Sequence, residues 1–274
     1  MTKSEIVLLA KLGYSIEEIE KISLVNNLNC LKDKGVKNKE ILNKINEGLN
    51  SGEYSILTYW DDEYPDKLKN IWNPPIFLFY KGNISLLNES SLAVVGTRKI
   101  SKYGYKVTKY FVDYLKKNFV IVSGMALGVD SVAHWNALGN TVAVLGSGVN
   151  VCYPKSNERL YNKILENGCV LSEYYPWEKP KKEYFPMRNR IVSGITDGVL
   201  IVEGKIKSGT MITAKFSLEF GREVFAIPGD IFNENSECPN FLIKNGAIPV
   251  TKPEDIVDYL QFERGIMYEN GHEH

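Results

Sequence analysis

The sequence has few cysteines and histidines for its 274 residues. It contains three histidines and four cysteines, which lie far apart and form no CxxC pair (Cys30, Cys152, Cys169 and Cys238). A structural zinc site needs clustered cysteine or histidine ligands, and a disulfide-stapled domain needs dense, regularly spaced cysteines. The sequence therefore predicts a reduced protein with neither a metal site nor a disulfide framework.

Long hydrophobic runs are also missing. The first apolar run, Ile6–Ala10, has only five residues before Lys11, and no later run is long enough to cross a membrane. A secretory signal core needs roughly 7–15 apolar residues and a membrane-spanning helix roughly 18 or more. We therefore expect a soluble protein of the cytoplasm that has no membrane partner.

The sequence has no excess of charge of either sign. Its 33 basic and 33 acidic residues exclude a strongly basic protein that coats nucleic acid indiscriminately. The charges are unevenly distributed, however, because residues 91–250 carry 20 basic and 14 acidic side chains whereas both flanking segments are acidic. The middle of the chain is therefore the part that suits a polyanionic ligand.

Apolar periodicity divides the chain into segments. Near its start, apolar residues recur at helical spacing, which predicts a small all-helical domain over residues 1–52. Residues 53–90 are expected to form a connector with a short strand, a short helix and an extended stretch. An α/β domain is predicted over residues 91–262, followed by a tail over 263–274.

Five apolar runs in the middle of the chain each end in glycine. They are LAVVG at 92–96, FVIVSG at 119–124, TVAVLG at 141–146, GVLIVEG at 198–204 and EVFAIPG at 223–229. Continuous rather than alternating apolar residues are typical of parallel strands buried on both faces. Because helical segments lie between most of these runs, we predict a doubly wound, mostly parallel α/β sheet.

Such sheets bind ligands at the carboxyl ends of their strands, where all five glycines are expected. The first turn, Gly96-Thr97-Arg98, lacks the GxGxxG pattern, so we predict no dinucleotide cofactor. It instead offers a bare backbone, a hydroxyl and a guanidinium that can bind a phosphate. Other basic residues nearby are interpreted as a solvated helix face (Lys102, Lys106 and Lys109).

The next two turns add candidates of the same kind. Ser123-Gly124 ends a buried strand and is a candidate phosphate or sugar cradle, while Asp130 either caps the following helix or contacts ligand. His134 is interpreted as a packed or capping residue rather than a base. Lys155 precedes a helix, where a cation opposes the helix dipole unless an anion is bound, and Asn157 follows it.

Two further clusters follow in the chain. Arg188-Asn189-Arg190 stands before a buried strand, where two arginines are costly without partners. We favour a ligand contact, and the alternative is an internal ion-pair network with Glu203 or Asp197. Lys207-Ser208-Gly209-Thr210 begins a predicted helix as an anion-binding turn, and no Walker A spacing accompanies it. Several phosphate-sized sites along one edge, with aromatic residues nearby, favour an extended single-stranded nucleic acid.

These segments closely resemble the DNA-processing protein A family, also called DprA or Smf. The matching stretches run in family order over about 200 residues: YPDKLKNIWNPPIFLFYKGN (64–83), VVGTRKISKYG (94–104), VSGMALGVDSVAH (122–134), TVAVLGSGVNVCYPKSN (141–157), FPMRNRIVSG (185–194), VLIVEGKIKSGTMITA (199–214), GREVFAIPGD (221–230) and LIKNGA (242–247). The resemblance implies single-stranded DNA binding, protection of incoming DNA and loading of the RecA recombinase during natural transformation. It also implies an extended Rossmann-like domain, a homodimer that pairs through this domain, and no established catalytic step.

The resemblance also assigns residues. It implies DNA contacts by Arg98, Lys155, Arg188, Asn189 and Arg190, and a backbone cradle formed by Gly96, Ser123, Gly124, Ser208 and Gly209. The N-terminal helices look like the sterile-alpha-motif-like (SAM-like) domain of many members. Many relatives continue into a C-terminal winged helix, whereas this sequence stops after a predicted acidic helix near 253–261, so we expect no duplex-binding module.

An enzyme is the main alternative. Related Rossmann-like folds of the Lonely Guy type cleave nucleoside monophosphates and need a carboxylate just after a Gly-Thr turn. Here Gly209-Thr210 is followed by no acidic residue before Glu219, which argues against hydrolysis. We therefore predict a DNA-binding protein that is not an enzyme, and a nucleotide-sensing module is a third, weaker hypothesis.

Overall fold

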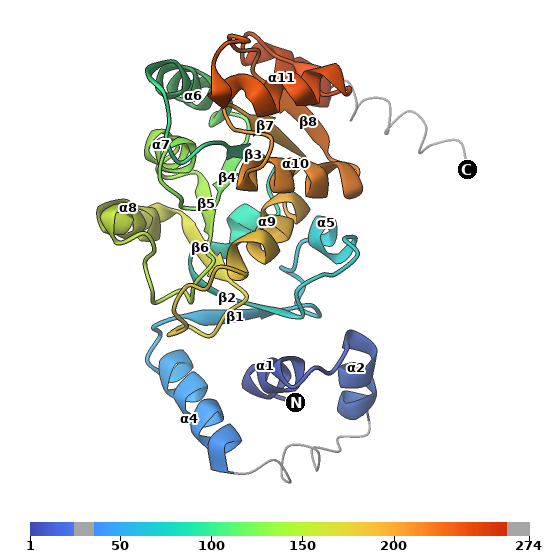
Figure 1. The fold of residues 1–274 in the computed structure, drawn as a ribbon. Coiled ribbons are helices and arrows are strands. Elements are labelled where there is room, and N and C mark those ends of the chain that lie inside the picture. The colour runs from blue at the N-terminus through green and yellow to red at the C-terminus, as the bar shows by residue number, and fades with distance from the viewer. Residues whose placement is uncertain (25–35, 262–274) are drawn as a thin grey trace, which may run out of the picture.

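The computed structural model describes residues 1–24 and 36–261, and within them the fold centres on a nine-stranded sheet (Figure 1). The strand order is β1-β2-β6-β5-β4-β3-β7-β8-β9. The strands are β1 (Ser55–Thr58), β2 (Phe77–Gly82), β3 (Ser91–Val95), β4 (Val120–Ser123), β5 (Thr141–Val144), β6 (Cys169–Ser172), β7 (Gly198–Ile201), β8 (Glu223–Ala226) and β9 (Ile248–Pro249). The predicted tail over 263–274 lies outside the described residues.

The five predicted apolar runs are confirmed as the parallel strands β3, β4, β5, β7 and β8. Two further parallel strands, β6 and β9, were not predicted. The apolar run of β6 is short and ends in Ser172 rather than in glycine. Central strand β3 pairs with β4 on one side and β7 on the other, so the winding of the chain reverses between β3 and β7. This reversal is the usual ligand position in a doubly wound sheet.

The predicted connector, residues 53–90, contains the expected strand, helix and extended stretch, but it does more than connect. Strands β1 and β2 pair with each other and β2 pairs with β6, in both cases antiparallel, so this segment extends the main sheet. Edge pairing of this kind depends on a distant strand and therefore leaves no local pattern in the sequence.

Helices cover both faces of the sheet, as predicted for a doubly wound fold (Figure 1). Side chains of α5, α9, α10 and α11 pack on one face, with Val142 and Val144 of β5. Helices α6, α7 and α8 and the helical residues 254–261 lie on the other, with Ala143. Their bounds are α5 (Asp66–Lys69), α6 (Lys102–Leu115), α7 (Val129–Asn136), α8 (Glu158–Asn167), α9 (Tyr184–Gly194), α10 (Gly209–Glu219) and α11 (Glu237–Lys244), with 3-10 turns η1 (Ile84–Leu87), η2 (Lys155–Asn157) and η3 (Glu234–Ser236).

The N-terminal helices are α1 (Lys3–Lys11), α2 (Ile16–Leu24) and α4 (Val36–Asn50), and they pack beside the β1 edge (Figure 1). Helix α1 begins with a capping box between Thr2 and Glu5. Val7 and Ile45 are fully buried in the same apolar cluster as Phe79 of β2. The N-terminal helices therefore share a core with the sheet. None of the described helices is long and apolar enough to cross a membrane.

Candidate nucleic-acid interface

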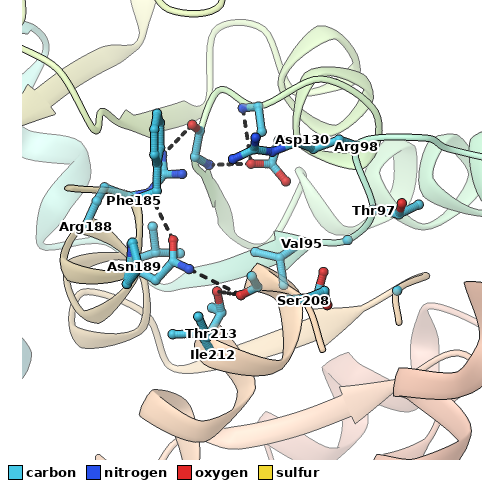
Figure 2. A pocket seen from close by; sticks show the side chains of 18 of the residues that line it. Val95, Thr97, Arg98, Asp130, Phe185, Arg188, Asn189, Ser208, Ile212 and Thr213 are labelled. Carbon is cyan, nitrogen blue, oxygen red and sulfur yellow. Dashed lines mark hydrogen bonds between the residues drawn. The ribbon is translucent and has the colours of Figure 1, made fainter. Parts of the chain in front are cut away.

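A cleft of about 780 Å³ opens at the carboxyl ends of the parallel strands (Figure 2). The turns after β3, β4 and β7 and the first turns of α9 and α10 enclose it, on both sides of the reversal between β3 and β7. Nine of the thirteen predicted site residues line it: Gly96, Thr97, Arg98, Gly124, Arg188, Asn189, Ser208, Gly209 and Thr210. The structure thus brings together candidates that lie more than 100 residues apart in the sequence.

The turn after β3 is fixed by Glu203, which lies two residues after the end of β7. The amide of Thr97 donates to the Glu203 carbonyl at 2.7 Å, and the Glu203 carboxylate accepts from the amide and hydroxyl of Ser101 at 3.0 and 2.5 Å. Ser101 also caps α6, because its hydroxyl accepts from the amide of Gly104 at 2.9 Å. Glu203 is buried in these contacts. It is therefore not the ion-pair partner of Arg188 or Arg190, which was the alternative to a ligand contact.

Arg98 is exposed at the mouth of the cleft, next to two aromatic rings. Its guanidinium carbon lies 5.4 Å from the ring centroid of Phe185, whose ring in turn lies 5.6 Å from that of Tyr153. No acidic side chain in the described parts of the chain forms an ion pair with Arg98. A cation stacked on a ring, with its donors free, can bind a phosphate and leave the neighbouring ring for a base.

Arg188 reaches the cleft from α9, and its guanidinium donates hydrogen bonds mainly to groups inside the protein. Nη1 donates to the carbonyl oxygens of Gly124 and Val144, and only 5% of the residue surface is exposed. Burial lowers the pKa of Arg188, and the nearby Asp130 carboxylate opposes this shift. A side chain at Gly124 would collide with the Arg188 guanidinium, so glycine is required for this approach.

Asp130 lines the cleft, and it does not cap α7 with its own side chain. Its carboxylate accepts from the amides of Gly124 and Ala126 at 3.2 and 3.3 Å, which fixes the turn after β4. Burial raises the pKa of Asp130, while Arg188 and the two amides act in the opposite direction. His134 is fully buried, as predicted, and its Nδ1 lies 2.7 Å from the hydroxyl of Thr141.

The first turn of α10 forms the opposite side of the cleft. The Ser208 hydroxyl donates to the Lys205 carbonyl at 2.6 Å and does not cap the helix, so the first amides of α10 remain available to an anion. Asn189 joins α9 to this turn by donating to the Gly209 carbonyl at 3.2 Å (Figure 2). A Cβ at Gly209 would meet no atom within 4 Å, since this backbone faces open space.

The structure places the other four predicted residues outside the cleft. The Ser123 hydroxyl is buried and donates to the Val94 carbonyl at 2.7 Å. Asn157 is buried beneath the turn after β4 and donates to the Met125 carbonyl at 2.9 Å. Lys155 lines a separate depression beside Lys81.

Arg190 is the fourth of these residues. Only 2% of its surface is exposed, and Nη2 pairs with both carboxylate oxygens of Glu173 at 2.6 Å. The alternative of an internal ion pair therefore describes Arg190, but with Glu173 as the partner. Asp197, one of the two partners considered, pairs instead with Lys67 at 2.8 Å.

Comparison with known proteins adds the family. A family model described as DNA recombination-mediator protein A matches residues 55–261. This chain belongs to that family. It is 46% identical over 212 residues to the DNA processing protein DprA of Streptococcus pneumoniae, covering 76% of this chain and 74% of that protein. It is also 46% identical over 204 residues to the protein Smf of Escherichia coli, covering 73% of this chain and 54% of that protein.

Two solved structures of family members are similar to this chain. That of S. pneumoniae DprA has a TM-score of 0.81 at 39% identity and covers 94% of this chain and 98% of its own. That of DNA processing protein A from Helicobacter pylori, described for its single-stranded DNA binding mode, has a TM-score of 0.71 at 31% identity and covers 77% and 97%. The family resemblance and the Rossmann-like fold predicted from the sequence are thereby confirmed.

The cleft of this family member also contains lysines that were not among the predicted DNA contacts, although Lys99 and Lys207 belong to two of the turns that the sequence singles out. Five lysines line it: Lys99, Lys181, Lys182, Lys205 and Lys207. Lys181 pairs with Glu178 and Lys205 with Glu234, whereas no ion pair of Lys99, Lys182 or Lys207 occurs within the described residues. The KPKK run at 179–182 is a basic signal that could have indicated this surface. Asp130 is the one carboxylate among the described residues that line the cleft.

The described residues hold no group of three or more histidine, cysteine, aspartate or glutamate side chains that could bind a metal ion. Burial raises the pKa of the Cys152 thiol to about 11, so this thiol is not poised as a nucleophile. The lining of the cleft offers anion binding by cations and backbone amides, together with stacking on two rings.

Proposed function

We propose that this protein is a recombination mediator of the cytoplasm that binds single-stranded DNA in the cleft, protects incoming DNA and loads RecA during natural transformation. The observation that carries the proposal is the combination of exposed cations, uncapped α10 amides and an aromatic pair at one sheet edge. The single-stranded DNA binding mode described for the H. pylori relative supports it.

Phosphates and bases would use different parts of the cleft. Arg98, Lys99 and Lys207 and the α10 amides suit phosphate oxygens, and Phe185 and Tyr153 suit the faces of unpaired bases. Stacking on rings tolerates every base, because each base has a π-face. We therefore propose binding with little sequence preference and with strong dependence on salt.

We propose a binding role rather than hydrolysis, because a glycosidic cleavage of the Lonely Guy type needs a carboxylate that faces the substrate. Asp130 is engaged with two backbone amides and lies beside Arg188, and no acidic residue follows Gly209-Thr210 before Glu219. Incubation with nucleoside monophosphates tests this directly. Release of free base above the buffer control would contradict the proposal.

Replacement of Arg98 tests the DNA site. Arg98→Ala should weaken binding of short unstructured oligonucleotides roughly tenfold, because a charged hydrogen bond to phosphate is lost. It should also reduce the slope of log affinity against log salt by about 0.7, the value for one phosphate on a single strand. Fluorescence anisotropy at several salt concentrations measures both quantities.

Lys163→Ala is the matched control, since it removes a cation that pairs with Glu166 on α8 outside the cleft. Its affinity and salt slope should equal those of the wild type. Lys155→Ala should have a smaller effect than Arg98→Ala, because Lys155 lines a separate depression. Equal affinity of wild type and Arg98→Ala would remove Arg98 from the site.

RecA loading requires a separate measurement. We expect the protein to shorten the lag before RecA hydrolyses ATP on DNA that is already coated by a single-strand-binding protein. The Arg98→Ala variant should lose this effect in proportion to its DNA affinity, whereas Lys163→Ala should retain it. An unchanged lag with the wild-type protein would contradict the mediator role while leaving DNA binding intact.

A further inference from the structure

Lys11, the last residue of α1, places its ammonium group beside one ring of β2 and two rings that follow β6. Although the residue is exposed, Nζ lies 5.4 Å from the ring centroids of Phe77, Tyr174 and Tyr175. Nζ also donates to the carbonyl of Glu173 at 3.0 Å. The ammonium group is buried although the residue as a whole is exposed, and this burial lowers the pKa of Lys11. The Glu173 carboxylate opposes this shift. A cation among aromatic faces is a specific contact between α1 and residues 173–178, which we call the wall segment.

Helix α4 makes a second contact of the same kind. Nζ of Lys44 lies 4.0 Å from the ring centroid of Trp177, and Trp177 stacks on Tyr175 with 5.4 Å between centroids. Two N-terminal helices that are distant in the sequence therefore hold one short segment. The Glu173 carboxylate is fixed separately by Arg190, so the start of the segment is anchored in the core even without the N-terminal lysines.

The wall segment also holds one side of the aromatic pair in the cleft. Tyr174 stacks on Tyr184, the first residue of α9, with 3.8 Å between ring centroids. The Tyr184 hydroxyl donates to the Glu178 carboxylate at 2.9 Å. Phe185, which stacks with Arg98, is the next residue of α9, so its place depends on that of Tyr184.

The loop that leads to Tyr153, the other ring of the aromatic pair, is hydrogen-bonded to the same segment. The amides of Gly148 and Asn150 donate to the carbonyls of Glu178 and Pro176 at 2.8 and 2.9 Å. A side chain at Gly148 would collide with wall-segment carbonyls, so glycine is required here. This loop leads directly to Tyr153, and both rings of the cleft are thus anchored to the wall segment.

We propose that the N-terminal helices act on DNA binding from outside the cleft, with Lys11 as a positioning residue that orders the wall segment and thereby the Tyr153–Phe185 pair. The expected effect on DNA affinity rests on the proposed function, whereas the ordering of the wall segment rests on the contacts described above. Lys11 itself is not among the residues that line the cleft, so its replacement removes no direct contact there.

The experiment compares Lys11→Met and Lys11→Arg with Lys3→Met. Lys3 lies on the same helix and joins it to the Ile56 carbonyl and to Asp61, so Lys3→Met controls for weaker docking of α1 alone. Hydrogen exchange of the amides between residues 174 and 186 reports order in the wall segment. Anisotropy with a single-stranded oligonucleotide reports affinity, and thermal unfolding verifies that the variants are folded.

We expect exchange of residues 174–186 to be roughly two- to fivefold faster in Lys11→Met than in Lys3→Met, and DNA affinity to fall by a similar factor. Lys11→Arg should restore both, because a guanidinium can occupy the same ring cage. Equal exchange in the two methionine variants would overturn the inference, as would faster exchange with unchanged affinity. If the wild type bound no single-stranded DNA, the proposed function would fail while the exchange comparison still tested the contact.

Discussion

At the scale of single residues, one buried charge pair organises the floor of the cleft. Asp130 fixes the turn after β4 through two amides, and Arg188 ties that turn to β5 through the carbonyls of Gly124 and Val144. Each charge lies in the other's field, and both are buried. Loss of one partner therefore leaves the other as an uncompensated buried charge.

Arg188→Met should lower the free energy of unfolding by about 3–5 kcal/mol, because Asp130 loses its compensating cation. The double variant Arg188→Met/Asp130→Asn should recover part of this loss, since no buried carboxylate remains. Urea unfolding at pH 7 measures both, with Lys163→Met as the surface control. A loss below about 1 kcal/mol would show that the pair is not coupled in this way.

His134 gives the protein a defined response to acid. Burial, with a further contribution from Arg188, lowers its pKa to about 3. Between about pH 6.5 and pH 3 the unfolded chain binds a proton at His134 and the folded chain does not. The free energy of unfolding therefore falls as the pH is lowered through this range. Its contribution to stability is complete above pH 6.5 and declines by about 1.4 kcal/mol per unit below it.

The measurement is urea unfolding of wild type and His134→Asn between pH 7 and pH 4. The variant loses packing at pH 7, but its stability should fall less steeply with acid than that of the wild type. The difference between the two proteins should therefore shrink as the pH falls. Parallel curves would show that His134 is protonated inside the folded protein.

At the scale of elements, the first turn of α10 has an uncovered backbone and amides that no side chain caps. Ser208 turns its hydroxyl away from the helix, and Gly209 leaves its backbone uncovered. The fold itself does not require glycine at 209, because no atom would obstruct a side chain there. The open space beside Gly209 is therefore available to a phosphate group of a ligand.

Gly209→Ala should therefore leave the fold intact and weaken DNA binding. Alanine in the first turn should stabilise the helix by up to about 1 kcal/mol, while its methyl group obstructs the approach of a phosphate to the amides. Thermal unfolding and anisotropy measure the two effects, and Lys215→Ala on the exposed side of the same helix is the control. An unchanged affinity would show that DNA does not approach this turn.

How far the sequence predicts these elements depends on how local the signal is. The five glycine-ended runs predict their strands because a strand buried on both faces must be continuously apolar. The roles of Arg188 and Arg190 were not separable, since residues two apart on a helix point about 200° apart and only the packing of α9 decides which one meets the cleft. The pairing of Glu173 with Arg190, and the membership of β1 and β2 in the sheet, arise from contacts between distant segments that leave no local pattern.

At the scale of the whole molecule, two large apolar side chains stand out beyond β8. Ile231 and Phe232 are 81% and 91% exposed on the turn between β8 and η3. Adjacent exposed apolar residues are unfavourable in water and are typical of contact surfaces. The homodimer is a prediction from the family resemblance, and these two side chains are tested here as its contact.

Light scattering after size exclusion should give a mass of twice 31.0 kDa for the wild type. Ile231→Asp/Phe232→Asp should shift the mass towards one chain, because charges at an apolar contact oppose association. Arg98→Ala, which changes the cleft only, should remain dimeric. A double variant with the wild-type mass would place the dimer contact on another surface.

The reversal of winding between β3 and β7 also has a consequence for synthesis of the chain. One side of the cleft is built from the turns after β3 and β4, and the other from α9 and α10, which end only at Glu219. A nascent chain that has left the ribosome as far as β6 holds Arg98 and the turn after β4 but has no second wall. Both sides of the cleft are therefore present only after the chain has been synthesised as far as α10.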